Sequence, residues 1–289
     1  MMEHFANGVS VSRKAIEIPN WIIEELLDMR QAMWDLHWDI KGEVAIHVDS
    51  GMEYTTTEQK KWPTIVHPHF PNPPRSNEFR DWWIDTEHQI YEVALKYLEK
   101  YPLLIHSLWW RDKGHALIYE PGARLILHQD NNVGYSWAGR DGIVGRSEVS
   151  TRNVLTTTLH VDDCEGGEMH FPYADVTIPA ERGDVLLFPA NYLGAHEVTP
   201  VKEGSRRISY LGWFGQGSTL PLATPKGEHE VEILQICDPA EMPDANFHWQ
   251  TSIEEDFLES SGWTEDKMRE EYESFFSQQA PLYWPKEER

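Results

Sequence analysis

The stretch Arg124-Leu-Ile-Leu-His128, which continues to Asp130, has the short apolar pattern of a β-strand and ends in two side chains that can bind a metal. Residues i and i+2 of a strand point to the same face, so His128 and Asp130 can reach one ion. His196 follows the apolar segment Gly183-Asp-Val-Leu-Leu-Phe-Pro189, whose turn would return it to the same end of a barrel. Two imidazoles and one carboxylate form the facial ligand set of divalent iron.

The presence of each of these residues can also be explained without a metal site. With 14 histidines and 48 acidic residues in the chain, a His-x-Asp pair can arise by chance and lie in a solvated loop. His196 would then be a buried histidine that bonds a backbone carbonyl. The order and spacing of the surrounding segments favour the metal site.

Short β-rich segments fill the middle of the chain, each bounded by Gly, Pro, Asn or Asp. Short strands bounded by such turn residues are typical of an antiparallel sandwich or jelly roll. We therefore expect a mainly β protein with flanking helices, whose core is a double-stranded β-helix, the cupin-like jelly roll. The expected strands are residues 116–119, 124–128, 153–161, 168–171, 175–178, 185–188, 196–199 and 207–214.

Three regions of one domain follow from this pattern. Residues 1–115 are expected to form a helical and loop region that packs on the barrel, residues 116–215 the catalytic core, and residues 216–289 an acidic, helical extension. Apolar periodicity predicts helices at 19–38, 81–100, 253–260 and 264–276, and one more strand at 230–236. Five prolines predict an ordered surface loop over 55–80.

Charge and cysteine content narrow the function classes. The formal charge of −23 opposes contact with a phosphate backbone. Residues 226–289 hold seventeen acidic against five basic residues, which is typical of a solvated acidic face. Only Cys164 and Cys237 are present, too few for a disulfide framework, and no leader pattern or run of eighteen apolar residues occurs. We expect a cytoplasmic protein with a small-molecule substrate and no nucleic-acid or membrane partner; the sequence does not indicate the oligomeric state.

Several motifs of the barrel region, taken together, resemble those of the iron(II)- and 2-oxoglutarate-dependent dioxygenases, in particular the prolyl-4-hydroxylase-like branch. The resemblance covers residues 115–215 and implies that His128, Asp130 and His196 hold Fe(II), with 2-oxoglutarate and O2 as co-substrates. It implies hydroxylation of an unactivated C–H bond, with release of succinate and carbon dioxide; desaturation, epoxidation or ring closure stay open. The motifs are Tyr119-Glu-Pro-Gly122, His128-Gln-Asp130, Glu165-Gly-Gly-Glu-Met-His-Phe-Pro172, Gly183-Asp-Val-Leu-Leu-Phe-Pro189 and His196-Glu-Val-Thr-Pro-Val-Lys-Glu-Gly204 with Arg206-Arg207-Ile-Ser-Tyr-Leu-Gly-Trp213.

In that family a basic residue on the last barrel strand pairs with the distal carboxylate of 2-oxoglutarate, and a guanidinium suits this role. Arg206 has the usual offset of ten residues from His196, whereas Arg207 begins the sequence Arg-x-Ser209. Residues 207, 209, 211 and 213 share one strand face. We therefore favour Arg207, with Ser209 beside the carboxylate and Arg206 outside in an ion pair. The resemblance implies that the Tyr119 hydroxyl also bonds 2-oxoglutarate; otherwise Tyr119 is a core tyrosine with a backbone partner.

Residues 131–152 interrupt the strands directly after the candidate ligands and are expected to form a lid-like loop. An arginine in this loop can clamp a carboxylate or phosphate of the substrate, or can merely pair with surface acids. The expected substrate-binding residues are Tyr135, Trp137, Arg140, Arg146 and Trp213.

The favoured function is hydroxylation of a small molecule, such as an amino acid or another metabolite, because long segments flank the barrel and can enclose a pocket. A peptidyl or protein hydroxylase of the same superfamily is one alternative, and it would present an open groove with exposed apolar or basic contacts. A cupin-type metalloprotein that is not an oxygenase is the other, and it would not need an arginine at the offset of Arg206 or Arg207 from His196.

Overall fold

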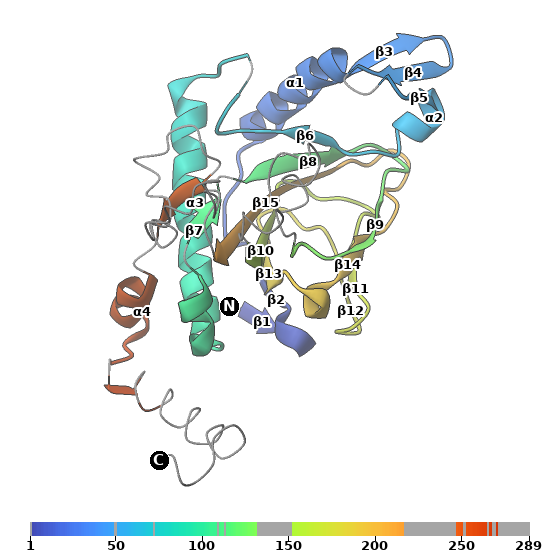
Figure 1. Cartoon of the computed structure of the whole chain (residues 1–289). Helices are drawn as coiled ribbons and strands as arrows, with labels where there is room; N and C mark the ends of the chain where they lie inside the picture. Colours follow the sequence, from blue (N-terminus) through green and yellow to red (C-terminus); the bar gives the residue numbers. More distant parts are fainter. Residues whose placement is uncertain are drawn as a thin grey trace, which may run out of the picture.

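The structure is a computed structural model that describes residues 2–48, 51–71, 73–108, 110–112, 114–131, 152–216, 247–250, 253–264, 266–267 and 270. Within these residues the chain forms antiparallel sheets flanked by helices (Figure 1). The expected strand 230–236 and most of the expected loop 131–152 and helix 264–276 lie outside them.

Two facing sheets form the expected double-stranded β-helix, and all eight expected strands are present with ends shifted by one or two residues. Every pair within the two sheets is antiparallel. The larger sheet contains, in spatial order, β8 (His115–Tyr119), β15 (Arg207–Gln216), β10 (Arg152–His160) and β13 (Val185–Pro189). The smaller sheet contains β9 (Leu125–His128), β14 (His196–Val198), β11 (Met169–Phe171) and β12 (Val176–Ile178).

Alternation along the strands of the larger sheet separates two apolar cores. Leu211 and Trp213 of β15 belong with Leu117 to the core inside the barrel. Ile208 and Tyr210 of the same strand face the opposite way, into the core under the helices. Each fully buried aliphatic side chain contributes roughly 1.5–3 kcal/mol. The barrel therefore has an inner face on which polar residues can be placed without disturbing the helix-covered face.

Helices cover the outer face of the larger sheet. Helix α1 (Asn20–His37) and helix α3 (Asn77–Leu98) contribute to the core on that face, and α4 (Ile253–Ser261) packs on α3 (Figure 1). The helices expected at 19–38 and 253–260 are confirmed. The helix expected at 81–100 begins four residues earlier, because the Ser76 side chain accepts a hydrogen bond from the Phe79 amide and caps it. None of the helices in the described part of the chain is long and apolar enough to cross a membrane.

The loop expected over 55–80 is wrong in part. It contains α2 (Thr56–Gln59), which starts with a capping box between Thr55 and Glu58, and β6 (Thr64–Val66), which pairs with β8. Pro63 and Pro68 flank β6, so their missing N–H groups fall outside its ladder of hydrogen bonds. A third sheet, which the sequence did not predict, contains β3 (Trp38–Lys41), β4 (Val44–His47) and β5 (Glu53–Thr55).

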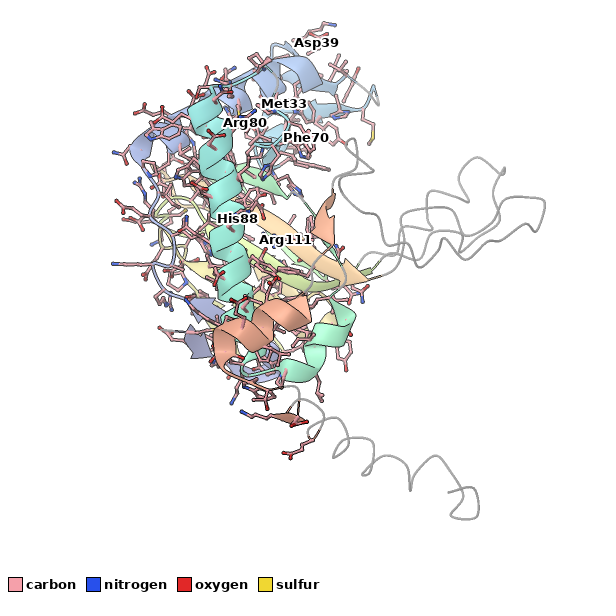
Figure 2. The ribbon with its side chains drawn as sticks, turned by 90° about the vertical axis from the view of Figure 1, so that its left-hand side faces the viewer. Met33, Asp39, Phe70, Arg80, His88 and Arg111 are labelled. Carbon is pink, nitrogen blue, oxygen red and sulfur yellow. The ribbon has the colours of Figure 1, made fainter. Side chains whose placement is uncertain are left out.

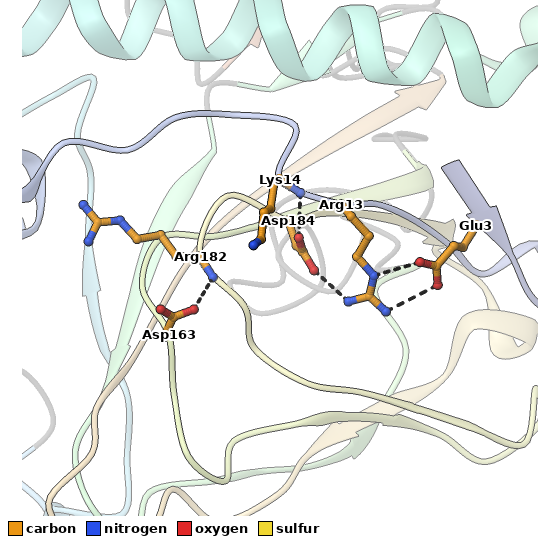
Figure 3. A network of polar contacts seen from close by, with 6 residues as sticks. All are labelled: Glu3, Arg13, Lys14, Asp163, Arg182 and Asp184. Carbon is orange, nitrogen blue, oxygen red and sulfur yellow. Dashed lines mark hydrogen bonds and ion pairs between the residues drawn. The ribbon is translucent and has the colours of Figure 1, made fainter. Parts of the chain in front are cut away.

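The N-terminal segment extends the larger sheet. Strand β2 (Ser10–Ser12) pairs with β13, and β1 (Met2–His4) pairs with β2. Next to this edge, the buried carboxylate of Asp184 accepts hydrogen bonds from Arg13 Nη1 at 2.7 Å and from the Lys14 amide at 2.8 Å (Figure 3). Arg13 also pairs with Glu3. At the other end of the sheet, β7 (Trp110–Asp112) pairs with β15 and with β16 (Phe247–Gln250).

Three short 3-10 helices complete the described elements. They are η1 (Ala6–Gly8), η2 (Pro102–Ser107) and η4 (Tyr192–Gly194). Of these, η4 directly precedes His196, so its position sets where that side chain enters the barrel.

A fully buried ion pair lies between α3 and the larger sheet. Glu87 Oε2 accepts a hydrogen bond from Arg111 Nε at 2.6 Å, and Glu87 also accepts one from the Tyr210 hydroxyl. Figure 2 places Arg111 against α3 at the level of His88. Burial alone raises the pKa of Glu87, but the charge of Arg111 and the hydrogen bonds from His69 and Tyr210 outweigh it and hold the pKa at about 2. The stability that this carboxylate contributes is therefore present above pH 4.5 and is lost as the pH falls toward 2.

Replacing Arg111 with leucine should lower the free energy of unfolding by about 3–5 kcal/mol, because the Glu87 carboxylate stays buried without its partner. The double variant Arg111→Leu, Glu87→Gln should recover part of this loss. Urea unfolding followed by tryptophan fluorescence measures both. Arg80→Ala is the control: its ion pair with Asp81 is exposed, so a change below about 0.5 kcal/mol is expected. Equal losses in the single and double variants would contradict this account.

Candidate active site

The three candidate metal ligands meet at one end of the barrel. His196 on β14 is the direct cross-strand partner of His128 on β9, and their ring centroids are 4.4 Å apart. Asp130 follows β9, and its Oδ1 lies 3.5 Å from His128 Nε2. One ligand atom from each of the three residues lies within 4.8 Å of the other two. This spacing and this donor set fit a single divalent cation, and the chemistry of two imidazoles and a carboxylate fits Fe(II).

Both histidines are oriented by backbone carbonyls. Nδ1 of His128 lies 2.7 Å from the Ile126 carbonyl oxygen, and Nδ1 of His196 lies 3.0 Å from that of Gly194. Each Nδ1 therefore carries the proton, which leaves Nε2 with a lone pair for a metal. Burial lowers the pKa of His196 to about 4, so this imidazole is neutral at pH 7, as metal binding requires.

Gly194 is required by the close approach of two chain segments. A Cβ at this position would lie 1.9 Å from the Pro189 carbonyl oxygen, a distance that no side chain permits. The turn that carries His196 is thus packed directly on the end of β13.

Asp130 is held by residues that the sequence did not single out. Thr156 Oγ1 donates a hydrogen bond of 2.8 Å to Asp130 Oδ2, and Asn153 Nδ2 donates one of 2.9 Å to the Asp130 carbonyl oxygen. The Asp130 amide in turn donates to the Ala190 carbonyl oxygen at 3.0 Å. These bonds leave Oδ1 directed toward His128. The run of three threonines between Leu155 and Leu159 was the available signal.

Arg207 lies fully buried on the inner face of β15. Its Nη1 donates a hydrogen bond of 2.7 Å to Ser209 Oγ, and its guanidinium carbon lies 5.0 Å from the ring centroid of Tyr119, its cross-strand partner on β8. Among the described residues, Nε has no hydrogen-bond partner and no carboxylate forms an ion pair with this side chain. Burial lowers the pKa of Arg207, yet a guanidinium remains charged. A buried cation without an anion indicates where an anionic ligand would bind.

Arg206 lies outside the barrel. Its side chain is 41% exposed, and Nε lies 3.0 Å from Glu120 Oε1, which Arg30 also contacts. Trp213 is half-buried, packs on the inner core and has its ring centroid 5.4 Å from that of His115. The other expected substrate residues, Tyr135, Trp137, Arg140 and Arg146, lie outside the described part of the chain.

Gly167 has two reasons to be glycine. It ends the turn before β11 with φ at +64°, a conformation that L side chains rarely adopt, and a Cβ there would lie 2.9 Å from Arg207 Cδ. The room that this glycine leaves for the stem of Arg207 could not be read from the sequence motif.

Residues 114–215 match the family model of the 2OG-Fe(II) oxygenase superfamily. The chain is similar to a viral collagen prolyl hydroxylase of Paramecium Bursaria Chlorella virus-1 in its 2OG complex, with 15% identity, a TM-score of 0.43, and coverage of 73% of this chain and 96% of that one. A Pseudomonas putida prolyl-4-hydroxylase gives 16% identity, a TM-score of 0.41 and coverage of 72% and 92%. No curated protein sequence matches the chain.

The family match spans both sheets of the barrel and every residue described above from Tyr119 to Trp213. The three candidate ligands and the buried arginine lie inside it, in the order in which the strands bring them together. The barrel of this chain, residues 114–215, is therefore similar to the 2OG-Fe(II) oxygenase superfamily, and its three candidate ligands suit the Fe(II) that the name of that superfamily implies.

Proposed function

We propose that this protein hydroxylates an unactivated C–H bond of a small molecule, with Fe(II) bound by His128, Asp130 and His196 and 2-oxoglutarate held by Arg207, Ser209 and Tyr119. The observation that carries the proposal is the buried charge of Arg207, which has no anion beside it in the described residues, in the same barrel as the three ligands. A cupin-type metalloprotein without a dicarboxylate co-substrate would not need a buried arginine to pair with a carboxylate.

The residues of the chain supply position and environment. When bound, Fe(II) and 2-oxoglutarate activate dioxygen, and succinate and carbon dioxide are released. Arg207 fixes one end of the co-substrate through its planar fork of donors, and Tyr119 forms the wall beside it. Thr156 and Asn153 keep Asp130 in one orientation toward the metal site. The apolar residues of the inner core, such as Phe188 and Phe171, exclude water from the reacting groups.

The substrate approaches the ligands from the side of His128. The His128 side chain is 30% exposed, whereas Asp130 is 7% and His196 is 2% exposed. Trp213 and His115, in contact with each other at the inner face of β15 and β8, offer an aromatic wall and a hydrogen-bonding ring to a substrate. These groups suit a compact molecule with an apolar part.

A peptide substrate is the second candidate, and one observation favours it. Ile126 and Leu127, directly before His128, are 70% and 49% exposed, so the rim next to the most accessible ligand is apolar. Exposed apolar contacts of this kind are what an extended peptide would use.

Changing His128 or His196 to alanine should abolish stoichiometric binding of Fe(II) under anaerobic conditions, because each change removes one of three ligands. Iron content after gel filtration, together with far-UV circular dichroism, separates lost binding from lost folding. His170→Ala is the matched control, since this histidine on β11 bonds Thr177 and not the site. Full iron occupancy in both ligand variants would overturn the assignment.

Arg207→Ala should weaken 2-oxoglutarate binding by about 2–5 kcal/mol, the cost of truncating one partner of a buried charge pair. Arg206→Ala should leave the affinity unchanged, because Arg206 already pairs with Glu120 outside the barrel. Anaerobic titration of the iron-to-2-oxoglutarate charge-transfer band compares the two variants. If Arg206→Ala alone weakened binding, the assignment to Arg207 would be wrong.

The protein should release succinate from 2-oxoglutarate in air with Fe(II), above its uncoupled background, when the correct substrate is present. Separate pools of amino acids, other metabolites and proline-containing peptides distinguish the two candidate substrate classes. Mass spectrometry of the consumed compound should show the gain of one oxygen atom that derives from O2. Stimulation by the peptide pool alone would favour the second candidate, and Asp130→Ala serves as the inactive control.

A further inference from the structure

Strand β6 extends the larger sheet beyond the strands that the family model matches. It pairs with β8, lies between α1 and β8 in Figure 1, and falls outside residues 114–215. Ile65 lies directly opposite Leu117, which belongs to the inner core, whereas Val66 is buried in the helix-covered core. Alternate residues share a face, so Ile65 and His67 continue the inner face of the barrel wall outward.

Three aromatic rings follow one another along this face. The ring centroid of His67 lies 5.7 Å from that of His115 on β8, and the centroid of His115 lies 5.4 Å from that of Trp213 on β15. Trp213 is the cross-strand partner of Thr156, which bonds the candidate ligand Asp130. The row of rings therefore leads from the edge strand to the metal ligands.

Exposure to solvent falls along the row toward the metal site. His67 is exposed, His115 and Trp213 are half-buried, and Asp130 is buried. Burial and His67 lower the pKa of His115, and the Asp130 carboxylate is near enough to oppose them. Ile65, which is 46% exposed, adds an apolar contact at the outer end. A molecule that enters along β6 therefore meets His67 first, then His115 and then the metal site.

The fold does not use the ring nitrogens of the two outer histidines. In the part of the chain that the structure describes, the rings of His67 and His115 form no hydrogen bond, whereas His128 and His196 each bond a backbone carbonyl. Packing alone would be served as well by phenylalanine, which brings no polar atom to be satisfied. The ring nitrogens of His67 and His115 are therefore open to a ligand.

Both rings are neutral at pH 7. Burial lowers the pKa of His67, and burial together with the charge that His67 carries when protonated lowers that of His115 to about 4. A neutral imidazole has one donor and one acceptor nitrogen, so the pair offers both kinds of group side by side. A carboxamide matches this combination, because its carbonyl accepts and its N–H donates. A carboxylate only accepts, and the nearby charge of Asp130 would repel it.

We propose that His67 and His115 bind an uncharged carboxamide of the substrate, with Trp213 packed against the plane of the amide, and so place a nearby C–H bond at the metal site. This inference rests on the proposed function and names the substrate class of the same site. It assigns part of the choice of substrate to β6, a strand outside the family match. The amide can belong to a compact metabolite or to a peptide, and the probes of the test separate these two sources.

The test titrates the protein, loaded with diamagnetic Zn(II) and 2-oxoglutarate, with propionamide and with propionate, which have the same shape and differ in charge. The imidazole nitrogen signals of His67 and His115, assigned by their loss in His67→Phe and His115→Phe, should shift saturably with propionamide and not with propionate. The signals of His170 on β11 are the internal control. A blocked penta-alanine peptide is the third probe: if it also shifts the signals, the amide is that of a peptide, and if only propionamide does, the amide is that of a compact molecule.

Two variants test each histidine through the signals of the other. His67→Phe and His115→Phe should each weaken propionamide binding by about two- to tenfold, the range for one neutral hydrogen bond. His67→Gln, which keeps a neutral donor and acceptor, should restore part of the loss, and His170→Phe should leave the affinity unchanged. The affinity for 2-oxoglutarate, measured from the charge-transfer band of the Fe(II) protein, should stay the same in all four variants.

Three results would overturn the proposal. They are signals of His67 and His115 that stay in place with both amide probes, equal shifts with propionate and propionamide, and unchanged propionamide affinity in both phenylalanine variants. A wild-type protein that forms no charge-transfer band with Fe(II) and 2-oxoglutarate would instead refute the proposed function itself.

Discussion

The larger sheet has to satisfy two environments at once, and the site depends on this constraint. One face packs under α1 and α3, where Leu155, Leu159 and Ile208 are buried among apolar side chains. The other face lines the barrel, where Thr156, Arg207 and Ser209 lie buried. Because alternate residues of a strand point in opposite directions, a shift of one residue in register would exchange the two sets. The apolar face therefore fixes the register that brings the polar residues together.

This constraint explains why the barrel could be predicted from the sequence. Each barrel strand is short, apolar on at least one face and bounded by turn residues, and these signals are local. The choice of Arg207 over Arg206 also followed from strand parity, and the structure places Arg207 inside the barrel and Arg206 outside beside Glu120. The metal triad could be predicted for the same reason, since His128 and Asp130 are two residues apart and the turn after β13 returns His196 to them.

The residues that escaped prediction act through contacts between distant segments. Thr156 bonds Asp130 across 26 positions of the chain, and nothing near either residue signals that contact. Gly167 and Arg207, whose stem occupies the space that this glycine leaves, also belong to different segments. The small sheet of β3, β4 and β5 was missed because its strands have only three or four residues, too few to establish a period of two. Residues such as Arg140 and Arg146 stay predictions, because they lie outside the described residues.

The pairing of β2 with β13 has a consequence for the order in which the chain folds. Ser10 pairs with Leu187 and Ser12 with Val185, so β2 pairs with a strand that follows it by more than 170 residues in the chain. During synthesis, the edge of β2 that pairs with β13 must therefore stay open until β13 has left the ribosome. The contact between Asp184 and Arg13 is equally distant in sequence, so it cannot guide the early steps. We expect the closing of this sheet edge to be a late, slow event in folding, because contacts of high sequence separation form slowly.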